Sequence, residues 1–332
     1  MTWLLAVQGD SADVVRADGS GPLVSVILPT RDRPGSLCAA LESVILQSHR
    51  HLEVLVVDDA SGTPASDAAD AVVRGDRRVR FERLDAPGGA ARARNAGLSL
   101  ASGDFVAFLD DDDSWERQKV ERQLEYLGSH SEVGIVSCHY WVVDPHGRRA
   151  PIVYRGPASY TAGQVQWMNL PGSFSFVMAR RSLLGEELSL DETFPSVEDW
   201  DLWLRCVRVA PAGVVPETLA RHSFHGGLSK PTSERLGLDA FIRKHGTSMP
   251  EACRVFQGAH LRMLAGRGLG HRAEVLRSLA TRSPGVSTLL VAEQLARQIG
   301  RARRDPGMVA RTVAGLVRPD GSTVGAWRHR TR

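Results

Sequence analysis

The sequence has few lysines and few cysteines. Only Lys119, Lys230 and Lys244 are lysines, so that almost all of the positive charge is arginine. The four cysteines stand far apart and form no Cys-x-x-Cys pair, which argues against a zinc site and a disulfide framework. No window reaches the roughly 18 apolar residues of a membrane-spanning helix. The first seven residues lack a basic segment and make a poor signal peptide, so we expect a cytoplasmic protein.

The chain also lacks a large net charge. Its 332 residues are 42% hydrophobic and 24% charged, which suits one large or two ordinary domains and excludes a mostly disordered protein. The formal net charge is +3, but residues 250–332 contain 15 arginines and five acids, which is +10, so residues 1–249 carry −7. An acidic body with a basic C-terminal region indicates two parts with different roles.

Apolar, β-branched segments alternate with helical patterns in the first third of the chain. We expect buried strands at Leu23–Leu28, Val54–Val57, Val79–Phe81 and Phe105–Leu109. We expect a helix at Ala90–Leu100. Such strands, separated by helices, predict a parallel sheet covered on both faces. Ligands bind beyond the carboxyl ends of such strands, where this sequence has polar loops at residues 30–33, 58–59 and 110–113.

The second half shows antiparallel and helical patterns. We expect a hairpin between Trp141–Val143 and Ile152–Tyr154, a strand at Phe174–Met178, and helices at Trp115–Leu127 and Trp200–Val209. Beyond residue 250 the strand patterns stop, and a helical face with an arginine stripe follows. We therefore predict an N-terminal extension (1–20), an α/β domain (21–249) and a basic helical region (250–332).

Four consecutive aspartates, Asp110–Asp113, follow one of the expected strands. A run of acids is most often a solvated loop. Here a buried strand leads directly into the run, and adjacent carboxylates raise each other's pKa unless a cation neutralises them. Carboxylates suit Mg²⁺ or Mn²⁺, which keep water ligands and bridge to substrate phosphates. The run therefore favours a metal–diphosphate site.

Two other strand-end segments have alternative interpretations. Asp58 and Asp59 fit either an Asx-type turn or helix cap, or hydrogen bonds to a ribose hydroxyl or a base N–H. The glycine-rich turn at residues 87–89 precedes a helix with Arg92 and Arg94, which suit base or phosphate oxygens. Its spacing matches neither the dinucleotide fingerprint nor the P-loop.

Glu198 and Asp199 begin one of the expected helices. Acids in a first turn complement the helix dipole, and Ser196 suits the N-cap position, so a structural role is the simpler interpretation from the residues alone. A carboxylate at this place would also suit general-base chemistry, because a hydroxyl is too weakly acidic to attack unaided.

Five segments together resemble the family 2 glycosyltransferases, whose fold is called GT-A. They are Val24–Asp32, Val56–Ser61, Ala93–Gly97, Phe108–Asp113 and Glu198–Arg205, within a resemblance that extends to about residue 229. It implies an α/β fold with a Rossmann-like mixed sheet flanked by helices, followed by a C-terminal helical appendage. Residues 21–115 would be the nucleotide-binding half, and residues 116–249 the acceptor half.

The resemblance also implies roles for residues. Those that would hold the nucleotide-sugar are Pro29, Thr30, Arg31, one of Asp58 or Asp59, Arg94, Asp110 and Asp111. Asp110 and Asp112 match the family's Asp-x-Asp motif, with Asp110 near the ribose and Asp112 as the direct ligand of Mn²⁺ or Mg²⁺. The register of the four aspartates against this motif is ambiguous, and in another register Asp111 exchanges roles with a neighbouring aspartate. His225 matches a histidine near the metal or the diphosphate, and Asp199 matches the general base.

The function that follows from the resemblance is a metal-dependent, inverting glycosyltransferase. It would move a sugar from a nucleotide-diphosphate sugar to a hydroxyl of a glycan, a lipid-linked sugar or a small natural product by direct displacement. The alternative is a non-catalytic nucleotide-sugar-binding protein or scaffold of the same fold. We do not expect nucleic-acid binding, because no recognition motif accompanies the basic charge.

The basic region 250–332 lies outside this resemblance and has two interpretations. The first is a helical appendage that packs on the body and helps to form a homodimer. The second is contact with an anionic membrane surface, which would place the protein at the inner face of the membrane.

Overall fold

The computed structural model of the protein describes residues 21–143, 147, 149–152, 158–223, 231–251, 253, 254, 257, 258 and 261. The chain divides into two compact units, Met1–Phe241 and Ile242–Arg332. The first unit contains the sheet and all of the expected site residues. The expected extension 1–20 and nearly all of the basic region 250–332 lie outside the described residues, and the boundary after residue 249 stays a prediction.

The described strands form one mixed sheet. They are β1 (Val24–Thr30), β2 (Leu52–Asp58), β3 (Val79–Arg83), β4 (Phe105–Phe108), β5 (Ser114–Trp115), β6 (Ile135–Val143), β7 (Arg149–Ile152), β8 (Ser159–Tyr160), β9 (Met178–Arg180) and β10 (Ala212–Ser223). The order is β3-β2-β1-β4-β9-β6-β10-β5, with β7 on β6 and β8 on β10. Strands β3, β2, β1 and β4 are parallel, whereas β9 is antiparallel to β4 and β6. The expected parallel strands are confirmed. A hairpin with β6 is present as well, but its second strand is Arg149–Ile152 instead of Ile152–Tyr154, and residues 153 and 154 lie outside the described residues.

Helices connect these strands. The α-helices are α1 (Pro34–Ile45), α2 (Ala65–Val73), α3 (Ala90–Leu100), α4 (Lys119–Ser129), α5 (Ala162–Val165), α6 (Arg181–Leu184), α7 (Glu198–Val209) and α8 (Pro231–His245). Short 3-10 helices are η1 (Phe174–Phe176), η2 (Gly185–Leu188) and η3 (Gly246–Ser248). Proline at the first position of α1 suits a helix start, because its missing N–H would have no partner there. Helix α3 has the expected bounds.

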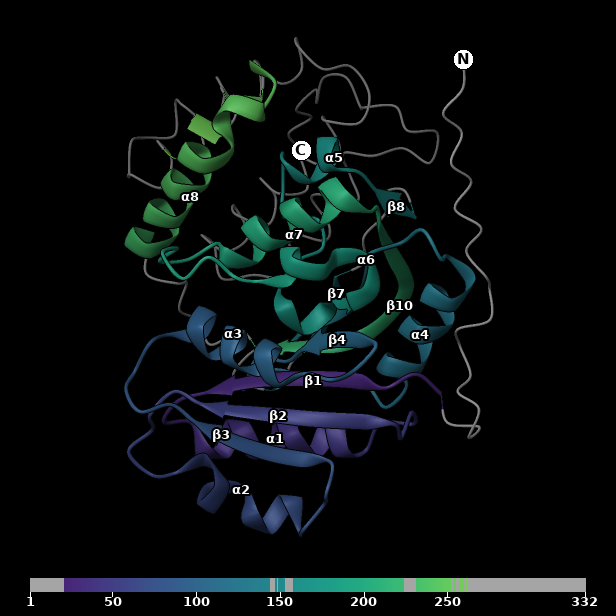
Figure 1. Ribbon diagram of the computed structural model, residues 1–332, viewed down its shortest axis with the longest axis vertical. Helices are drawn as coiled ribbons and strands as arrows, with labels where there is room; N and C mark the ends of the chain where they lie inside the picture. Colours follow the sequence, from purple (N-terminus) through teal and green to yellow (C-terminus); the bar gives the residue numbers. More distant parts are fainter. Residues whose placement is uncertain are drawn as a thin grey trace, which may run out of the picture. The chain divides into compact units, whose positions relative to one another are not determined.

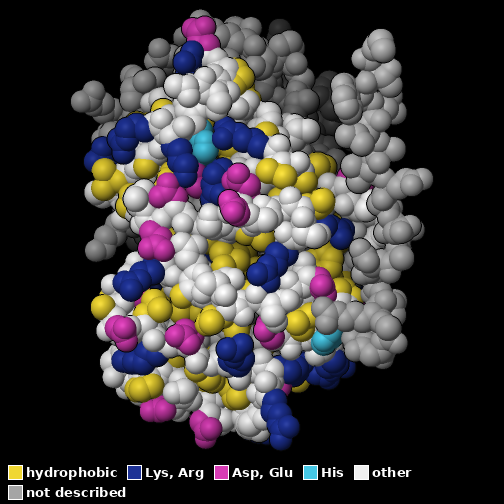
Figure 2. Space-filling view, viewed as in Figure 1, with side chains coloured by type: hydrophobic (Ala, Val, Ile, Leu, Met, Phe, Trp, Pro, Cys, Tyr) yellow, Lys and Arg dark blue, Asp and Glu magenta, His cyan; other side chains and the backbone are white. Residues whose placement is uncertain are grey.

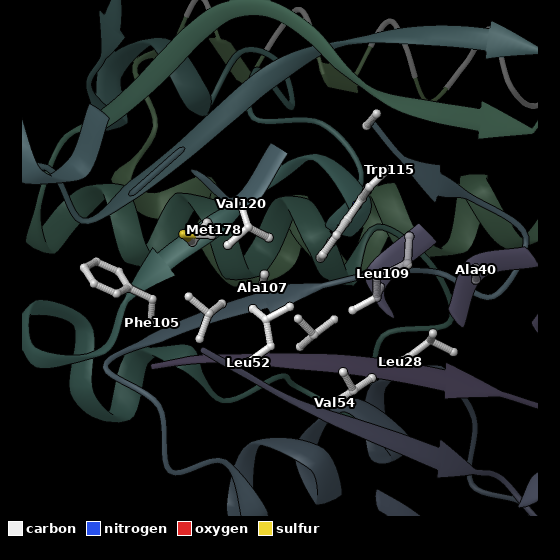
Figure 3. Packing of buried hydrophobic residues seen from close by; sticks show 14 of the residues in the cluster. Leu28, Ala40, Leu52, Val54, Phe105, Ala107, Leu109, Trp115, Val120 and Met178 are labelled. Carbon is white, nitrogen blue, oxygen red and sulfur yellow. The ribbon is translucent and has the colours of Figure 1, made fainter. Parts of the chain in front are cut away.

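The two faces of β1 pack against different helices. Val26 and Leu28 belong to a core cluster that includes Leu37 and Leu41 of α1, and Figure 3 shows part of this cluster around β1, β2 and β4. Helix α3 covers the other face (Figure 1), where a Cβ on Gly97 would lie 2.5 Å from Cγ2 of Ile27. Glycine therefore lets α3 approach β1 closely, which brings the start of α3 to the strand ends.

Three expected boundaries are wrong. Phe174–Phe176 form η1 instead of a strand, and β9 begins only at Met178. The helix expected from Trp115 begins at Lys119, because Ser114 and Trp115 pair with β10. Ser196 is not the N-cap of α7: Val197 occupies that position with a φ of 71°, and no side chain caps the helix.

The surface of the first unit has mixed charge. Figure 2 shows basic and acidic side chains interspersed over the described part of the face that it presents. Among the described helices, none combines the length and the apolar content that crossing a membrane requires.

Candidate functional site

The carboxyl ends of β1, β2 and β4 meet at one edge of the sheet. Thr30 ends β1 opposite Asp58, the last residue of β2, and Asp110 follows β4 on the other side of β1. Two loops at this edge contain non-glycine residues with left-handed backbone, Asp32 with φ 53° and Ala60 with φ 56°. Such strained residues cluster at functional sites, where the surrounding structure holds them.

Two of the four consecutive aspartates are buried and hold neighbouring segments. Asp111 accepts hydrogen bonds from Thr30 Oγ1 over 2.8 Å and from Arg33 Nη1 over 3.0 Å. Burial raises the pKa of the Asp111 carboxyl above its ordinary value, and Thr30 and Arg33 offset this only in part. Asp113 accepts from the Ser223 N–H over 3.0 Å and lies 3.1 Å from Nδ1 of His222. Asp111 and Asp113 therefore fasten the run to β1, to the loop between β1 and α1, and to β10.

The other two aspartates are partly exposed. The side chain of Asp112 is 21% exposed and forms an ion pair with Arg33 Nη1 over 2.9 Å. That of Asp110 is 25% exposed and pairs with Arg94 Nη2 over 2.5 Å. Asp110 also accepts from Ser173 Oγ over 3.1 Å, and its N–H donates to Ser175 Oγ over 3.1 Å. Exposure thus alternates along the run, with Asp110 and Asp112 toward the open side.

Arg94 joins the acidic run to the start of α7. Its guanidinium is buried, with its centre 3.7 Å from the centroid of the Phe174 ring. One nitrogen bonds Asp110, and the other lies 3.4 Å from Oε1 of Glu198. Arg94 therefore brings the acid run after β4 close to the Glu198–Asp199 pair at the start of α7. That Arg94 contacts a nucleoside stays a prediction.

Asp199 lies in the first turn of α7 and is partly exposed. Its Oδ2 accepts from Asn169 Nδ2 over 2.8 Å, and its Oδ1 accepts from the Trp200 N–H over 2.7 Å. Burial, followed by the neighbouring Glu198, raises the pKa of the Asp199 carboxyl to about 7, although these hydrogen bonds and Arg94 act in the opposite direction. A carboxyl group with this pKa can accept a proton at neutral pH.

Asp58 and Asp59 both organise loops. Asp58 accepts from the backbone N–H groups of Ser61 and Ala65 and pairs with Arg83 over 2.7 Å. Burial alone would raise the pKa of Asp58, but these partners hold it below its ordinary value. Asp58 therefore holds the loop between β2 and α2, and its contact with a nucleoside stays a prediction. Asp59 accepts from the N–H groups of Gly88 and Gly89 over 2.6 and 2.9 Å, which holds the turn before α3.

Most of the other expected residues are at the same edge. Pro29 and Thr30 are the last residues of β1, and Arg31 is exposed with its Nε 3.6 Å from Asp32. His225 lies outside the described residues. The sequence interpretation assigned no role to Arg33, Asn169, Ser173, Ser175 or His222. Arg33 alone had a signal, because it is a basic residue in the first strand-end loop, opposite the acidic run.

The donor set at the open side fits a divalent cation. The described residues contain no group of three or more His, Cys, Asp or Glu placed to hold a metal ion. Asp110 and Asp112 nevertheless present two carboxylates toward the open side. Mg²⁺ usually binds through one or two carboxylates, and substrate phosphates and water supply the remaining ligands. Two carboxylates are therefore sufficient if a diphosphate binds here.

Comparisons with known proteins identify relatives of this chain. The model of glycosyl transferase family 2 matches residues 25–188. An uncharacterized glycosyltransferase of Rickettsia felis (strain ATCC VR-1525 / URRWXCal2) is 31% identical over 206 residues, which is 61% of this chain and 33% of the relative. The chain thus spans about a third of the length of this curated relative.

Two solved structures have the same fold. Residues 1–349 of S. aureus TarS, crystallised with UDP-GlcNAc, align with a TM-score of 0.58 at 16% identity, covering 88% of this chain and 90% of that one. The mannosyltransferase PcManGT of Pyrobaculum calidifontis, in complex with GDP-Man and Mn²⁺, aligns with a TM-score of 0.56 at 17% identity, covering 88% and 86%. At these identities the likeness shows the GT-A fold.

Proposed function

Since the chain belongs to glycosyl transferase family 2 through residues 25–188, we propose that it is a metal-dependent, inverting glycosyltransferase. It transfers a sugar from a nucleotide-diphosphate sugar to an acceptor hydroxyl by direct displacement. The observation that carries the proposal is the Arg94 bridge, which bonds Asp110 on one side and approaches Glu198 on the other. The bridge brings a carboxylate pair suited to a metal and a carboxylate suited to a base into one site.

The donor's nucleoside lies at the ends of β1 and β2 in this proposal. Pro29 and Thr30 end β1 and Arg31 follows it, and one of Asp58 or Asp59, at the end of β2, binds the nucleoside. TarS with UDP-GlcNAc and PcManGT with GDP-Man support a nucleotide-sugar as donor and leave the base and the sugar open.

The diphosphate lies near Asp110 and Asp112. These two residues would hold Mn²⁺ or Mg²⁺, with Asp111 as the buried residue that orients them and His225 as a further ligand. A divalent cation bound here would neutralise negative charge on the leaving diphosphate. The structure of PcManGT in complex with GDP-Man and Mn²⁺ supports this assignment.

The base in this proposal is Asp199. Its carboxylate removes the proton of the acceptor hydroxyl as the hydroxyl oxygen forms a bond to the anomeric carbon of the donor. The bond from that carbon to the diphosphate oxygen breaks in the same step, and the nucleoside diphosphate leaves with the electron pair. One displacement from the opposite side inverts the anomeric configuration.

A panel of UDP-, GDP- and dTDP-sugars with Mn²⁺ tests the proposal. Release of nucleoside diphosphate is expected with at least one donor, and its absence with every donor and acceptor class would refute the activity. The variant Asp199→Asn should keep donor binding in calorimetry but lower kcat by about 10²–10⁴-fold. Asp112→Ala should lose metal-dependent donor binding. Glu186→Gln, at an exposed acid of η2, is the control and should retain both properties. Full turnover by Asp199→Asn would remove the base assignment.

The acceptor and the basic region complete the proposal. The acceptor hydroxyl belongs to a glycan, a lipid-linked sugar or a small natural product. Residues 250–332 help to form a homodimer or, as the second choice, contact anionic lipid at the inner face of the membrane. Light scattering of the full chain tests the dimer, and sedimentation with phosphatidylserine vesicles at low salt tests the lipid contact. A monomer that stays in the supernatant refutes both.

A further inference from the structure

The turn after α5 presents one amide side chain to Asp199. Asn169 Nδ2 donates to Oδ2 of Asp199 over 2.8 Å, and Asn169 Oδ1 accepts from the Gly172 N–H over 3.2 Å. A backbone N–H only donates, so the amide oxygen must face Gly172 and the amide nitrogen must face the carboxylate. The backbone of the turn therefore fixes which end of the Asn169 amide meets Asp199.

This turn is fastened to the buried frame that also holds Asp199. The carbonyl of Pro171 accepts from Ser137 Oγ of β6 over 2.7 Å. The carbonyl of Gly172 accepts from Trp203 Nε1 over 2.8 Å, and Trp203 is a fully buried residue of α7. Asp199 lies one turn earlier in the same helix. The distance between Asn169 and Asp199 is thus set by rigid elements on both sides.

The groups that face Asp199 come from three elements. Helix α7 supplies the Glu198 carboxylate and the Trp200 N–H, α3 supplies the Arg94 guanidinium, and the turn supplies the neutral Asn169 amide. Burial and Glu198 favour the protonated carboxyl, whereas the two N–H donors and Arg94 favour the carboxylate. Asn169 is therefore a donor that favours the ionised form without adding charge to the site.

We propose that Asn169 is a positioning residue for the base: its amide N–H orients the Asp199 carboxylate toward the acceptor hydroxyl and favours the ionised form of that group. The inference rests on the proposed function, because it concerns the base of that reaction. A carboxylate has about four lone-pair sites. Two of those on Asp199 receive N–H groups of the protein, and the remaining ones are directed away from these donors and can accept the hydroxyl proton.

The pH dependence of kcat tests this role. The base must be deprotonated, so activity rises with pH through the pKa of Asp199. In Asn169→Ala the carboxylate loses a donor, its pKa rises, and the acidic limb should move upward by about one pH unit or more. At pH 7 kcat should fall about fivefold for a shift of one unit, with the donor KM unchanged, and a higher pH should restore it. Asn169→Asp, which adds a second negative charge, should move the limb further.

Ser137→Ala is the matched control. It removes the hydrogen bond from Ser137 to Pro171, whereas the bonds of Gly172 to Asn169 and to Trp203 remain and hold the amide in place. This variant should lower the melting temperature without moving the acidic limb. An unmoved limb in Asn169→Ala, or an equal shift in Ser137→Ala, would overturn the positioning role.

A titration without substrate separates this inference from the proposed function. Carbon-13 NMR of the full chain, labelled at the aspartate carboxyl carbons, follows Asp199 through a resonance that Asp199→Asn lacks. The midpoint should be higher in Asn169→Ala than in the wild type. Equal midpoints in the two proteins would refute the role of Asn169. Absence of wild-type activity with every donor would instead refute the proposed function, and the titration would still show whether Asn169 lowers the pKa of Asp199.

Discussion

Replacing Arg94 by methionine tests whether one guanidinium holds two acidic segments together. Methionine keeps apolar contact with the Phe174 ring and removes the charge. The Arg94 side chain is 5% exposed, whereas those of Asp110 and Glu198 are 25% and 21% exposed. In the variant these two carboxylates lose their common partner in a largely desolvated place.

The expected loss lies at the lower end of the range for buried ion pairs. Removal of one partner from a buried pair costs about 3–5 kcal/mol, because an uncompensated charge remains. Water reaches both carboxylates in part, the second contact is 3.4 Å long, and Ser173 still donates to Asp110. We therefore expect the free energy of unfolding to fall by about 3 kcal/mol.

Urea denaturation of the full chain at pH 7, followed by circular dichroism, measures this loss. Arg92→Met is the matched control, because Arg92 is exposed two residues earlier in α3, and it should change stability by less than about 0.5 kcal/mol. Adding Asp110→Asn to Arg94→Met should recover at least about 1 kcal/mol, because one unpaired charge is removed. Equal losses in Arg94→Met and Arg92→Met would refute the bridge, and so would the absence of recovery.

Two further predictions concern stability. Lys119 is wholly buried above the Trp115 ring, and burial lowers its pKa to about 8 from 10.5. Between these pH values the unfolded chain binds more protons than the folded chain, so the free energy of unfolding of the wild type should rise with pH in that window. The free energy of unfolding of Lys119→Met should not show this rise. Equal changes between pH 8 and pH 10 for the two proteins in urea denaturation would contradict the prediction. Gly97→Ala places a Cβ against Ile27 and should lower the free energy of unfolding by about 1–3 kcal/mol. Gly35→Ala is the control, because a Cβ at residue 35 has no atom within 4 Å. Equal urea midpoints for the two variants would contradict the close approach of α3 to β1.

The strands and α3 were predictable because their signals are local. Leu23–Leu28 and Val54–Val57 are short apolar runs, and a parallel strand buried on both faces needs such a run. The strand predicted at Phe174–Phe176 is wrong, because contacts with distant residues outweigh the local pattern there. Its aromatic residues alternate as in a strand. Gly172 has a φ of 82°, however, Ser173 Oγ donates to the Asp110 carboxylate and the Asp110 N–H donates to Ser175 Oγ, and these features require a tight turn there.

The candidate site was predictable only as a set of segments. The sequence indicated that Asp110–Asp113 would lie at a strand end, but the hydrogen bonds to Asp111 and Asp113 come from β1, from the loop between β1 and α1, and from β10. Asn169 had no local signal, because an asparagine in a turn is common and its partner Asp199 is 30 residues away. Contacts of this kind depend on the packing of α7 against the sheet.

The acidic excess of the body is partly a means of holding loops. The carboxylates of Asp58 and Asp59 bind backbone N–H groups, and those of Asp111 and Asp113 bind the segments around the run. Replacing any of these four residues therefore moves a loop as well as removing a charge. Asp112 differs, because its side chain is partly exposed and its ion pair with Arg33 is on the open side. Loss of donor binding in Asp112→Ala, with an unchanged melting temperature, thus reports on the ligand site, whereas the same loss in Asp113→Ala reports first on the fold.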